Sequence, residues 1–247
     1  MDLIERDLRD LGGVRAPAGF HTRVLAAAGL VDSYAELASA IGRAFVAWNA
    51  AGVSAVMRAD SAGEFEAWFE RRIGRPLVRE SAPPKALARM GFDLRNVTAF
   101  ERDVLLKTAQ IPRGEVRTYS WVAREIGRPA AVRAVGSAVA HNPIPLLIPC
   151  HRVVRADGLI GQYSMGGPKA KRTLLADEGV DPEELERLAR ERVRYTGSRT
   201  THIFCVPTCR HARRTQEGNR VNFKSEDQAF GSGYRPCKVC RPAALAS

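Results

Sequence analysis

Four cysteines near the C-terminus constrain the fold of this chain more than any other feature. Cys205 and Cys209 form a C-x3-C pair, and after twenty-seven intervening residues Cys237 and Cys240 form a C-x2-C pair. Two close pairs of this kind are typical of a tetrahedral zinc site held by thiolates. We therefore expect residues 196–247 to form a small domain in which these sulfurs bind one Zn²⁺. The spacing alone leaves open whether that zinc is purely structural.

The rest of the composition predicts an intracellular globular protein. The chain has 247 residues, of which 45% are hydrophobic. No apolar run reaches the roughly eighteen residues of a membrane span, and the charged start Met1-Asp2-Leu3-Ile4-Glu5-Arg6 is unlike a signal peptide. In a reducing cytosol, cysteines are more often metal ligands or catalysts than disulfide partners. We expect a cytoplasmic, nucleoid-associated monomer without a membrane partner.

Basic charge accumulates toward the C-terminus. The net charge is +11, and residues 196–247 carry nine basic and three acidic side chains, whereas residues 1–95 carry 13 and 12. Lysine and arginine bind polyanions by displacing condensed counterions. The charge therefore favours a polyanion such as DNA as the partner. A solvated basic surface without a partner remains an alternative.

Residues 1–95 have the pattern of an α/β scaffold. We expect a helix within residues 1–30, a hairpin over 43–57 and a short helix over 64–73. Nothing in this part forms a chemical constellation, and its only histidine, His21, is expected to be structural or exposed. The paired prolines Pro83 and Pro84 predict a linker to the next domain.

Residues 96–180 predict a mostly helical domain. An amphipathic helix is expected over residues 100–111, a helix capped by Thr118 over 119–126, and another helix over 130–140. Two short helices across a glycine-containing break suit a helix-turn-helix, whose second helix enters a DNA groove. Helical hairpins without a DNA partner are also common. The charged segment 181–195 is expected to be a helical connector.

The fifth cysteine, Cys150, follows a stiff and apolar approach that runs from Asn142 to Pro149. A thiol in apolar surroundings has a raised pKa and is inert unless a base or cation favours the thiolate. His151 is adjacent, but neighbouring side chains generally point apart, so a water relay is more credible than a direct pair. Glu178 is a candidate to orient the imidazole. These residues alone leave both a reactive and an inert thiol open.

Seven short motifs add to this picture. They are Ile111-Pro112-Arg113-Gly114-Glu115-Val116, Thr118-Tyr119, Arg133-Ala134-Val135-Gly136, Asn142-Pro143, Pro149-Cys150-His151-Arg152-Val153, Gly161-Gln162-Tyr163-Ser164 and Leu174-Leu175-Ala176-Asp177-Glu178-Gly179. In this order they resemble the catalytic domain of O6-alkylguanine-DNA alkyltransferases, also called methylated-DNA–protein-cysteine methyltransferases. The resemblance implies that Cys150 accepts an alkyl group, activated through His151 and Glu178, with Asn142 supporting the site.

The same resemblance implies how DNA is bound. Guanine O6 is hard to reach in a duplex, so the base must be flipped out. Arg133 would take the place of the extruded guanine, and Tyr119 would push its phosphate. The base pocket would be lined by Val153, Tyr163 and Ser164. Met165 is an additional residue relative to some relatives, so the loop that closes the pocket is expected to differ in shape.

The zinc segment has its own resemblance. Residues 200–209 (TTHIFCVPTC) and 233–242 (GYRPCKVCRP) resemble the zinc domain of the adaptive-response protein Ada. In that family the first cysteine takes a methyl group from a DNA methylphosphotriester, which implies Cys205 as a second acceptor. His202 stands where relatives often have glycine. The domain is C-terminal here and we expect no transcriptional activator domain. Nearby phosphate contacts would come from Arg199, Arg210, Arg213, Arg214, Arg220 and Lys224.

These observations predict an α/β (α+β) protein with three domains. They are an N-terminal ribonuclease-H-like scaffold, a winged helix-turn-helix-like alkyltransferase domain, and a four-cysteine zinc domain. The expected function is single-turnover transfer of an alkyl group from O6-alkylguanine in double-stranded DNA to Cys150, with Cys205 as the second acceptor. Two other functions stay open: a damage-sensing DNA-binding protein switched by methylation of Cys205, and an alkyltransferase with a purely structural zinc.

Overall fold

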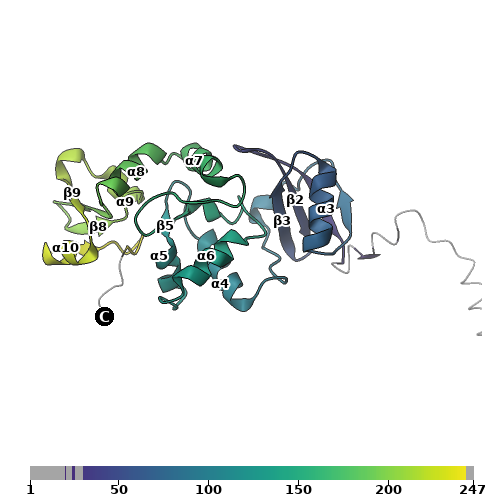
Figure 1. Ribbon diagram of the computed structural model, residues 1–247, viewed down its shortest axis with the longest axis horizontal. Helices are drawn as coiled ribbons and strands as arrows, with labels where there is room; N and C mark the ends of the chain where they lie inside the picture. Colours follow the sequence, from purple (N-terminus) through teal and green to yellow (C-terminus); the bar gives the residue numbers. More distant parts are fainter. Residues whose placement is uncertain (1–19, 21–23, 26–29, 243–247) are drawn as a thin grey trace, which may run out of the picture.

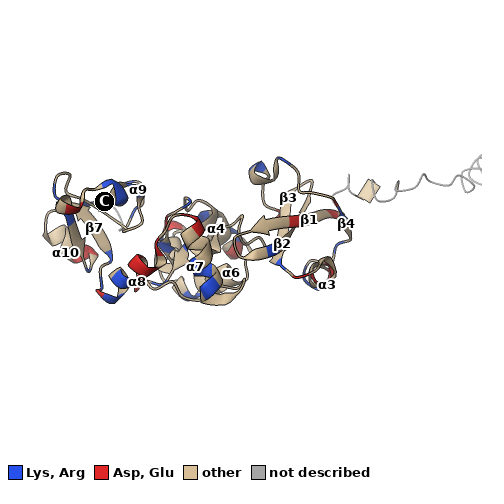
Figure 2. Ribbon diagram, turned by 90° about the horizontal axis from the view of Figure 1, so that it is seen from above, with Lys and Arg blue, Asp and Glu red and all other residues tan. Residues whose placement is uncertain are grey.

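The computed structural model describes residues 20, 24–25 and 30–242. These residues form three parts that lie in a row, in the order of the chain, in both views (Figures 1 and 2). The helix that the sequence predicts within residues 1–30 lies almost wholly outside the described residues. The mixed helix and strand content predicted from the sequence is confirmed.

In the residues from 30 onward, the N-terminal part is a four-stranded sheet covered by helix α3 (Ala62–Arg72). Its strands are β1 (Asp32–Ser39), β2 (Gly42–Asn49), β3 (Gly52–Arg58) and β4 (Leu77–Arg79), in the order β3-β2-β1-β4. Strand β4 runs parallel to β1, and the other neighbours are antiparallel. The β2–β3 hairpin is the predicted one, whereas β1 and β4 were not predicted. Helix α3 begins at Ser61, whose side chain caps it.

Both faces of this sheet are buried, and one of them joins the middle part. On the first face, Phe45 packs against Phe65 and Phe69 of α3. On the second, Val46 and Val56 pack with residues of the middle part, among them Leu105, Ile144 and Ile148. Because adjacent residues of a strand point to opposite faces, one apolar strand can serve two cores. The sheet therefore supports the middle part from one end.

The middle part contains the predicted helices. Helix α4 (Ala99–Ala109) starts with a capping box, and α5 (Tyr119–Glu125) starts at Thr118, whose hydroxyl accepts from the Trp121 backbone N–H. Helix α6 (Val132–Ala140) packs on both through Val135 and Val139. Strand β5 (Arg117–Thr118) pairs in parallel with β6 (Val153–Val154). Helix α7 (Gly167–Asp177) closes the part. Short 3-10 turns occur at Leu87–Arg89 and Cys150–Arg152.

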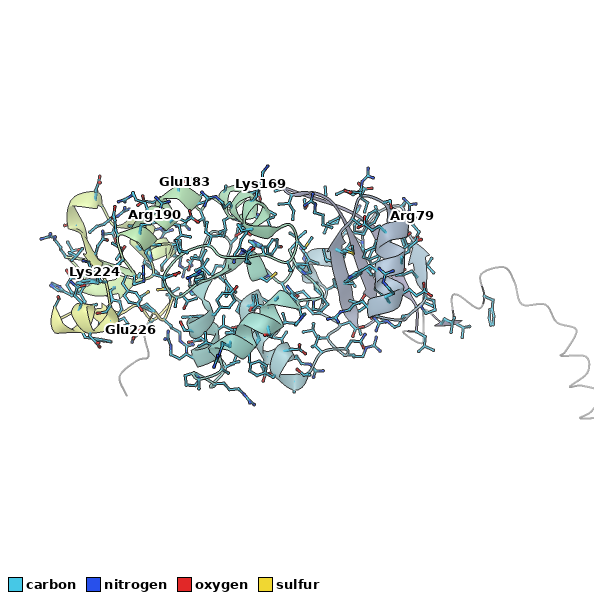
Figure 3. All side chains as sticks on the ribbon, viewed as in Figure 1. Arg79, Lys169, Glu183, Arg190, Lys224 and Glu226 are labelled. Atoms are coloured by element: carbon cyan, nitrogen blue, oxygen red, sulfur yellow. The ribbon has the colours of Figure 1, made fainter. Side chains whose placement is uncertain are left out.

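The connector is helix α8 (Pro182–Arg190), which begins at its cap Asp181 as the sequence predicts. Exposed ion pairs run along its surface, for example Arg187 with Glu184 and Glu191. Figure 3 labels Glu183 and Arg190 on this helix, between the middle and C-terminal parts. Its apolar side joins the middle part, where Leu185 packs with residues such as Val116 and Leu175.

The C-terminal part is a second four-stranded sheet with two short helices. Its strands are β7 (Tyr195–Ser198), β8 (Ile203–Cys205), β9 (Arg220–Phe223) and β10 (Arg235–Pro236), in the order β10-β8-β7-β9. Helices α9 (Arg210–Arg214) and α10 (Glu226–Gly231) and a 3-10 turn at Glu217–Asn219 complete it. Within the described residues, no helix is long and apolar enough to cross a membrane.

Candidate functional site

The Cys150 thiol lies at the start of a 3-10 turn that is clamped from two sides. Asn142 donates its Nδ2–H to the Ile148 carbonyl at 2.9 Å and accepts from the Ile144 N–H at 3.0 Å, which holds the preceding loop closed. From the N-terminal part, the Val56 N–H donates to the Pro143 carbonyl at 2.8 Å. Cys150 itself is only 2% exposed. The backbone that presents the sulfur is therefore fixed by both parts.

His151 is held as a neutral ring with one free acceptor. Its Nε2 lies 2.9 Å from Oε1 of Glu178. Burial lowers the pKa of the imidazole, and the hydrogen bond to Glu178 offsets only part of this effect. The neutral ring therefore donates Nε2–H to the carboxylate and leaves Nδ1 as the acceptor. Nδ1 is buried and finds no hydrogen-bond partner among the described residues.

Glu178 joins His151 to two further groups. Its carboxylate accepts from Nε and Nη2 of Arg152, at 2.8 and 2.7 Å, and from the Gly114 backbone N–H at 3.2 Å. Burial raises the pKa of this carboxyl, but the hydrogen bonds from His151 and Arg152 outweigh that effect and lower it to about 2. Glu178 is thus ionised at neutral pH. The sequence analysis gave Arg152 no role, although it lies within the Cys150 motif.

Burial raises the pKa of the Cys150 thiol, while hydrogen bonding to Asn142 and the positive charge of Lys171 offset only part of that rise. The resting thiol is therefore protonated at neutral pH. A sulfur in this state needs a proton acceptor at the moment of reaction rather than before it. The free Nδ1 of His151 is a candidate acceptor, and because it makes no direct hydrogen bond to the Cys150 sulfur, the proton would pass through a water, as the sequence analysis predicts.

Lys171 is a candidate functional residue that the sequence analysis did not single out. It is 1% exposed, and its ammonium group donates to the carbonyls of Val153 and Gln162 at 2.6 and 3.3 Å. Burial lowers its pKa to about 8, and the nearby Cys150 works in the opposite direction. The available signal was its position on the apolar side of α7, three residues before Leu174.

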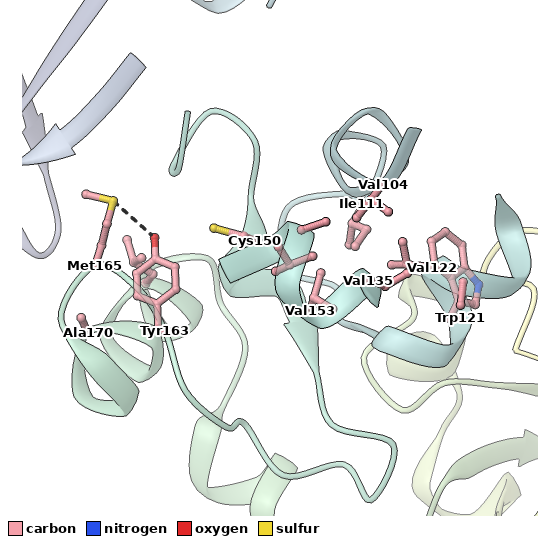
Figure 4. Close-up of a cluster of buried hydrophobic side chains, with 14 residues drawn as sticks. Val104, Ile111, Trp121, Val122, Val135, Cys150, Val153, Tyr163, Met165 and Ala170 are labelled. Atoms are coloured by element: carbon pink, nitrogen blue, oxygen red, sulfur yellow. Dashed lines mark hydrogen bonds between the residues drawn. The ribbon is translucent and has the colours of Figure 1, made fainter. Parts of the chain in front are cut away.

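The predicted base-pocket residues only partly come together. Figure 4 shows the Cys150 sulfur directed toward Tyr163 and Met165. Val153 and Tyr163 share the buried cluster around Cys150, and the Tyr163 hydroxyl donates to the Met165 sulfur at 3.8 Å. Tyr119 packs against the same cluster. Ser164, by contrast, is exposed at the mouth of the site.

A cavity of about 510 Å³ lies beside this pocket, between the N-terminal and middle parts. Asn142, Ser164 and Met165 line it from the middle part, and Arg58 lines it from β3. The Arg58 guanidinium approaches Gly166 so closely that a Cβ there would lie 2.9 Å from it. The loop with the additional Met165 is therefore covered by the N-terminal part.

Arg133 lies apart from the buried cluster. It is exposed in the first turn of α6, while Val135, Ala138 and Val139 form the buried face of the same helix. An exposed arginine at this end of the second helix of a helical pair is in a position to meet DNA.

The four C-terminal cysteines converge on one point. Cys205 ends β8, Cys209 precedes α9, and Cys237 and Cys240 follow β10. All four are buried, and their sulfurs lie within 4.8 Å of one another. A tetrahedral zinc with Zn–S bonds of about 2.3 Å would place the sulfurs about 3.8 Å apart. The donor set and its size therefore fit one Zn²⁺.

The four sulfurs differ in access. A cavity of about 300 Å³ opens beside Cys205 and Cys237, whereas Cys209 and Cys240 do not line it. Basic side chains, Arg235 and Lys238, lie on its wall. The basic surface continues over α9, which is drawn in blue in Figure 2.

His202 has a backbone conformation that is unfavourable for a residue with a side chain. Its φ is +50°, in the left-handed region that disfavours residues with a Cβ. The ring packs against Tyr234, with 5.1 Å between ring centroids. Glycine is the residue that this backbone conformation favours.

Comparisons with known proteins agree with this division of the chain. The family described as "6-O-methylguanine DNA methyltransferase, DNA binding domain" matches residues 99–180, and "Metal binding domain of Ada" matches residues 189–243. With the second match, the four converging cysteines are the ligands of one Zn²⁺.

Curated relatives carry the name methylated-DNA–protein-cysteine methyltransferase. The mouse protein is 45% identical over 115 residues, which are 46% of this chain and 53% of that protein. The Methanothermobacter thermautotrophicus protein is 34% identical over 156 residues, which cover 56% of this chain and 80% of that protein. The chain thus spans about half the length of the mammalian relatives. The solved Mycobacterium tuberculosis O6-methylguanine methyltransferase is 30% identical, with a TM-score of 0.49 over 60% of this chain and 92% of that one.

The Glu178 cluster predicts a specific dependence of stability on pH. The folded pKa of about 2 lies below the ordinary 4.5, so its stabilisation is fully present above pH 4.5 and is lost as pH falls toward 2. We expect Glu178→Gln to destabilise the protein at pH 7 by about 3 kcal/mol, because Arg152 loses a buried partner. The difference from the unmodified protein should shrink below pH 4.5.

Urea unfolding between pH 7 and pH 2 measures this difference. Asp177→Asn is the matched control, because the Asp177–Arg113 ion pair is more than half exposed on both sides and contributes little. A difference for Glu178→Gln that stays constant down to pH 2 would show that folding does not lower the pKa of the Glu178 carboxyl.

Proposed function

Because the chain belongs to the methylated-DNA–protein-cysteine methyltransferase family, we propose that it repairs DNA by moving the alkyl group of O6-alkylguanine onto its own Cys150. The observation that carries this proposal is the buried Cys150 thiol beside a neutral His151 that is bound to Glu178. A thioether has no acidic proton and no leaving group at neutral pH. Each chain therefore acts once at this site.

The transfer balances without another reactant. The Cys150 sulfur forms a bond to the alkyl carbon, and the bond between that carbon and guanine O6 breaks, leaving its electron pair on the guanine. The thiol proton passes by way of Nδ1 of His151 to the guanine, which restores the unmodified base. Meanwhile Glu178 stabilises the ring as it becomes positive, and Lys171 places a positive charge near the developing thiolate.

The partner in this proposal is double-stranded DNA that carries an alkylated guanine, met in the cytoplasm with the nucleoid. The base has to leave the stack to meet a sulfur that is 2% exposed. Helix α6 would enter the groove as the second helix of the α5–α6 pair, with the exposed Arg133 filling the space of the base. Tyr119 would contact the phosphate, and Val153, Tyr163 and Ser164 would receive the guanine.

We also propose roles for the flanking domains. The β3-β2-β1-β4 order and the packing of helix α3 on the sheet support a ribonuclease-H-like scaffold for residues 1–95. The hydrogen bond between Val56 and Pro143 suits this scaffold to holding the thiol loop in place. The pair β5–β6 beside α5 and α6 supports a winged helix-turn-helix for residues 96–180. Residues 181–195 would be the connector and 196–247 the zinc domain. The first strand of its sheet, β7, already begins at Tyr195, the last residue of the connector.

A second acceptor at Cys205 is favoured by one observation. Among the four ligands, Cys205 and Cys237 alone face the cavity with the basic wall, and Cys205 is the position that relatives of the Ada type use. Bound Zn²⁺ keeps the four sulfurs deprotonated at neutral pH. The Cys205 sulfur would then bond to the methyl carbon of a methylphosphotriester, while the carbon–oxygen bond breaks and a phosphodiester anion leaves.

The first prediction concerns the acceptor itself. Cys150→Ser should abolish transfer from O6-methylguanine in duplex DNA, because a hydroxyl at this pH is a far weaker nucleophile than a thiol. The fold and DNA affinity should stay nearly unchanged. Peptide mapping by mass spectrometry after incubation with the DNA checks both the loss in the variant and the modified residue in the unmodified protein. Stoichiometric transfer by the variant would overturn the assignment.

The second prediction concerns Arg133. Replacing it with Ala should slow repair in duplex DNA by about tenfold or more, because base extrusion costs a few kcal/mol. Reaction with free O6-benzylguanine, which needs no extrusion, should change little. Arg155→Ala is the control, since Arg155 is also an exposed arginine but is paired with Asp157 outside α6. Equal slowing with both substrates would make Arg133 a structural residue.

The third prediction concerns Cys205. After incubation with DNA carrying methylphosphotriesters, mapping should find methyl on Cys205 and none on Cys209 or Cys240, which do not line the cavity. Methylation removes one formal negative charge beside the DNA backbone, so DNA affinity should rise, and the gain should shrink with added salt.

The outcomes of that experiment separate the three functions. One zinc per chain without methyl on Cys205 means a structural or DNA-docking zinc domain, so that only Cys150 reacts. Methyl on Cys205 without a change in DNA affinity supports repair at this site and rules out the damage-sensing function. Methylation with increased affinity supports a damage-sensing role in addition to repair.

A further inference from the structure

The zinc domain makes hydrogen bonds to the middle domain at and beside two of its metal ligands, Cys209 and Cys240. Thr208, which precedes the ligand Cys209, accepts a hydrogen bond at its hydroxyl from the Val116 backbone N–H at 3.0 Å. Arg210, which follows the same ligand, donates its backbone N–H to Oε1 of Glu115 at 3.1 Å. Both bonds are made by buried or partly buried atoms.

A second set of bonds involves the ligand Cys240. Its carbonyl accepts from the indole Nε1–H of Trp121 in α5 at 3.0 Å. The next carbonyl, that of Arg241, accepts from Arg124, and the Arg241 side chain pairs with Glu125 at 3.1 Å. Because the metal fixes Cys209 and Cys240 relative to each other, it also fixes the spacing of the two contact sets.

The segment that the zinc domain holds, residues 114–118, reaches the reaction centre. The Gly114 N–H donates to Glu178, which in turn binds His151. Gly114 has a φ of +74°, and a Cβ there would lie 2.9 Å from the Glu178 carbonyl oxygen. The backbones of these two segments are therefore in close contact. At the other end of the segment, Arg117 of β5 pairs with Val153, three residues after Cys150.

The contact between residues 114–118 and the zinc domain contains a buried ion pair, so only one geometry satisfies its hydrogen bonds. Glu115 and Arg117 are 2% and 3% exposed, and they pair with each other at 2.6 Å. The second oxygen of Glu115 is the one that binds Arg210. A buried polar group that loses its partner is strongly disfavoured, so the segment has one well-defined arrangement when the zinc domain is docked.

We propose that the docked zinc domain is a positioning element of the Cys150 centre, and that Thr208 and Glu115 are its positioning residues. This inference rests on the proposed alkyl transfer to Cys150. The zinc domain holds the Gly114–Thr118 segment, this segment places the Gly114 N–H on Glu178, and Glu178 orients His151. The two sites of the chain are therefore coupled: a change in the zinc domain alters the rate at Cys150 without touching the substrate.

Thr208→Val tests the coupling in the zinc-loaded full-length protein, since it keeps the shape of the side chain and removes the hydroxyl. The rate of Cys150 alkylation by free O6-benzylguanine, a substrate that needs no DNA contact, should fall about two- to tenfold, the range expected for one buried hydrogen bond. Thr208→Ser, which keeps the hydroxyl, should restore the rate. Ser225→Ala is the control, because it removes the α10 cap inside the same domain.

Hydrogen–deuterium exchange provides the second measurement. In Thr208→Val, the amides of residues 114–118 should exchange faster than in the unmodified protein, and in Ser225→Ala they should not. Unchanged exchange, or equal rates for Thr208→Val and the unmodified protein, overturns the positioning role. A slower rate in Ser225→Ala as well assigns the effect to general loss of zinc-domain stability and also overturns it. If Cys150 of the unmodified protein is not alkylated by O6-benzylguanine, the proposed function is wrong. The hydrogen–deuterium exchange of residues 114–118 still tests whether the zinc domain positions this segment.

Discussion

The carboxylate of Glu178 accepts hydrogen bonds from two segments that are distant from it in the sequence, and so joins three segments in all. His151 and Arg152 belong to the thiol turn, Gly114 belongs to the turn before β5, and Glu178 itself ends α7. Buried charges are stable only when their hydrogen-bonding capacity is filled, so this one carboxylate requires all three segments to be in place together. The orientation of the imidazole, and with it the acceptor for the thiol proton, depends on this requirement.

The two flanking domains act on the same small region from opposite ends. The N-terminal sheet holds the Pro143 carbonyl through Val56 and packs on Ile144 and Ile148. The zinc domain holds Glu115 and Val116. Because a reacting sulfur tolerates little displacement relative to its proton acceptor, support of both the thiol loop and the Glu178 partner is consistent with the chemistry proposed for Cys150.

Features that depend on near neighbours in the chain were predictable from the sequence. The β2–β3 hairpin and the Thr118 cap belong to this group. The convergence of Cys205 and Cys209 with the distant second cysteine pair was predictable for another reason, because the spacing of zinc-binding cysteines is itself visible in the sequence. The pairing of His151 with Glu178 was also predicted, with the family resemblance as an aid. Strand β4 was missed because it is three residues long and is defined only by its pairing with β1. The buried position of Lys171 was not predicted because its ammonium group donates to backbone carbonyls, which every residue has and which no sequence pattern reveals.

The docking of the zinc domain also has a consequence for the order of folding. The bond between Val116 and Thr208 joins residues 92 positions apart, and the bond between Trp121 and Cys240 joins residues 119 positions apart. Contacts with such long separations form late, because a large loop must close before they stabilise anything. During synthesis the middle domain leaves the ribosome before residues 208–241, which include the contacts that the zinc domain makes with it. If the docked zinc domain positions the Cys150 centre as proposed, a newly made chain would reach its full reactivity only after the zinc domain has emerged and bound metal.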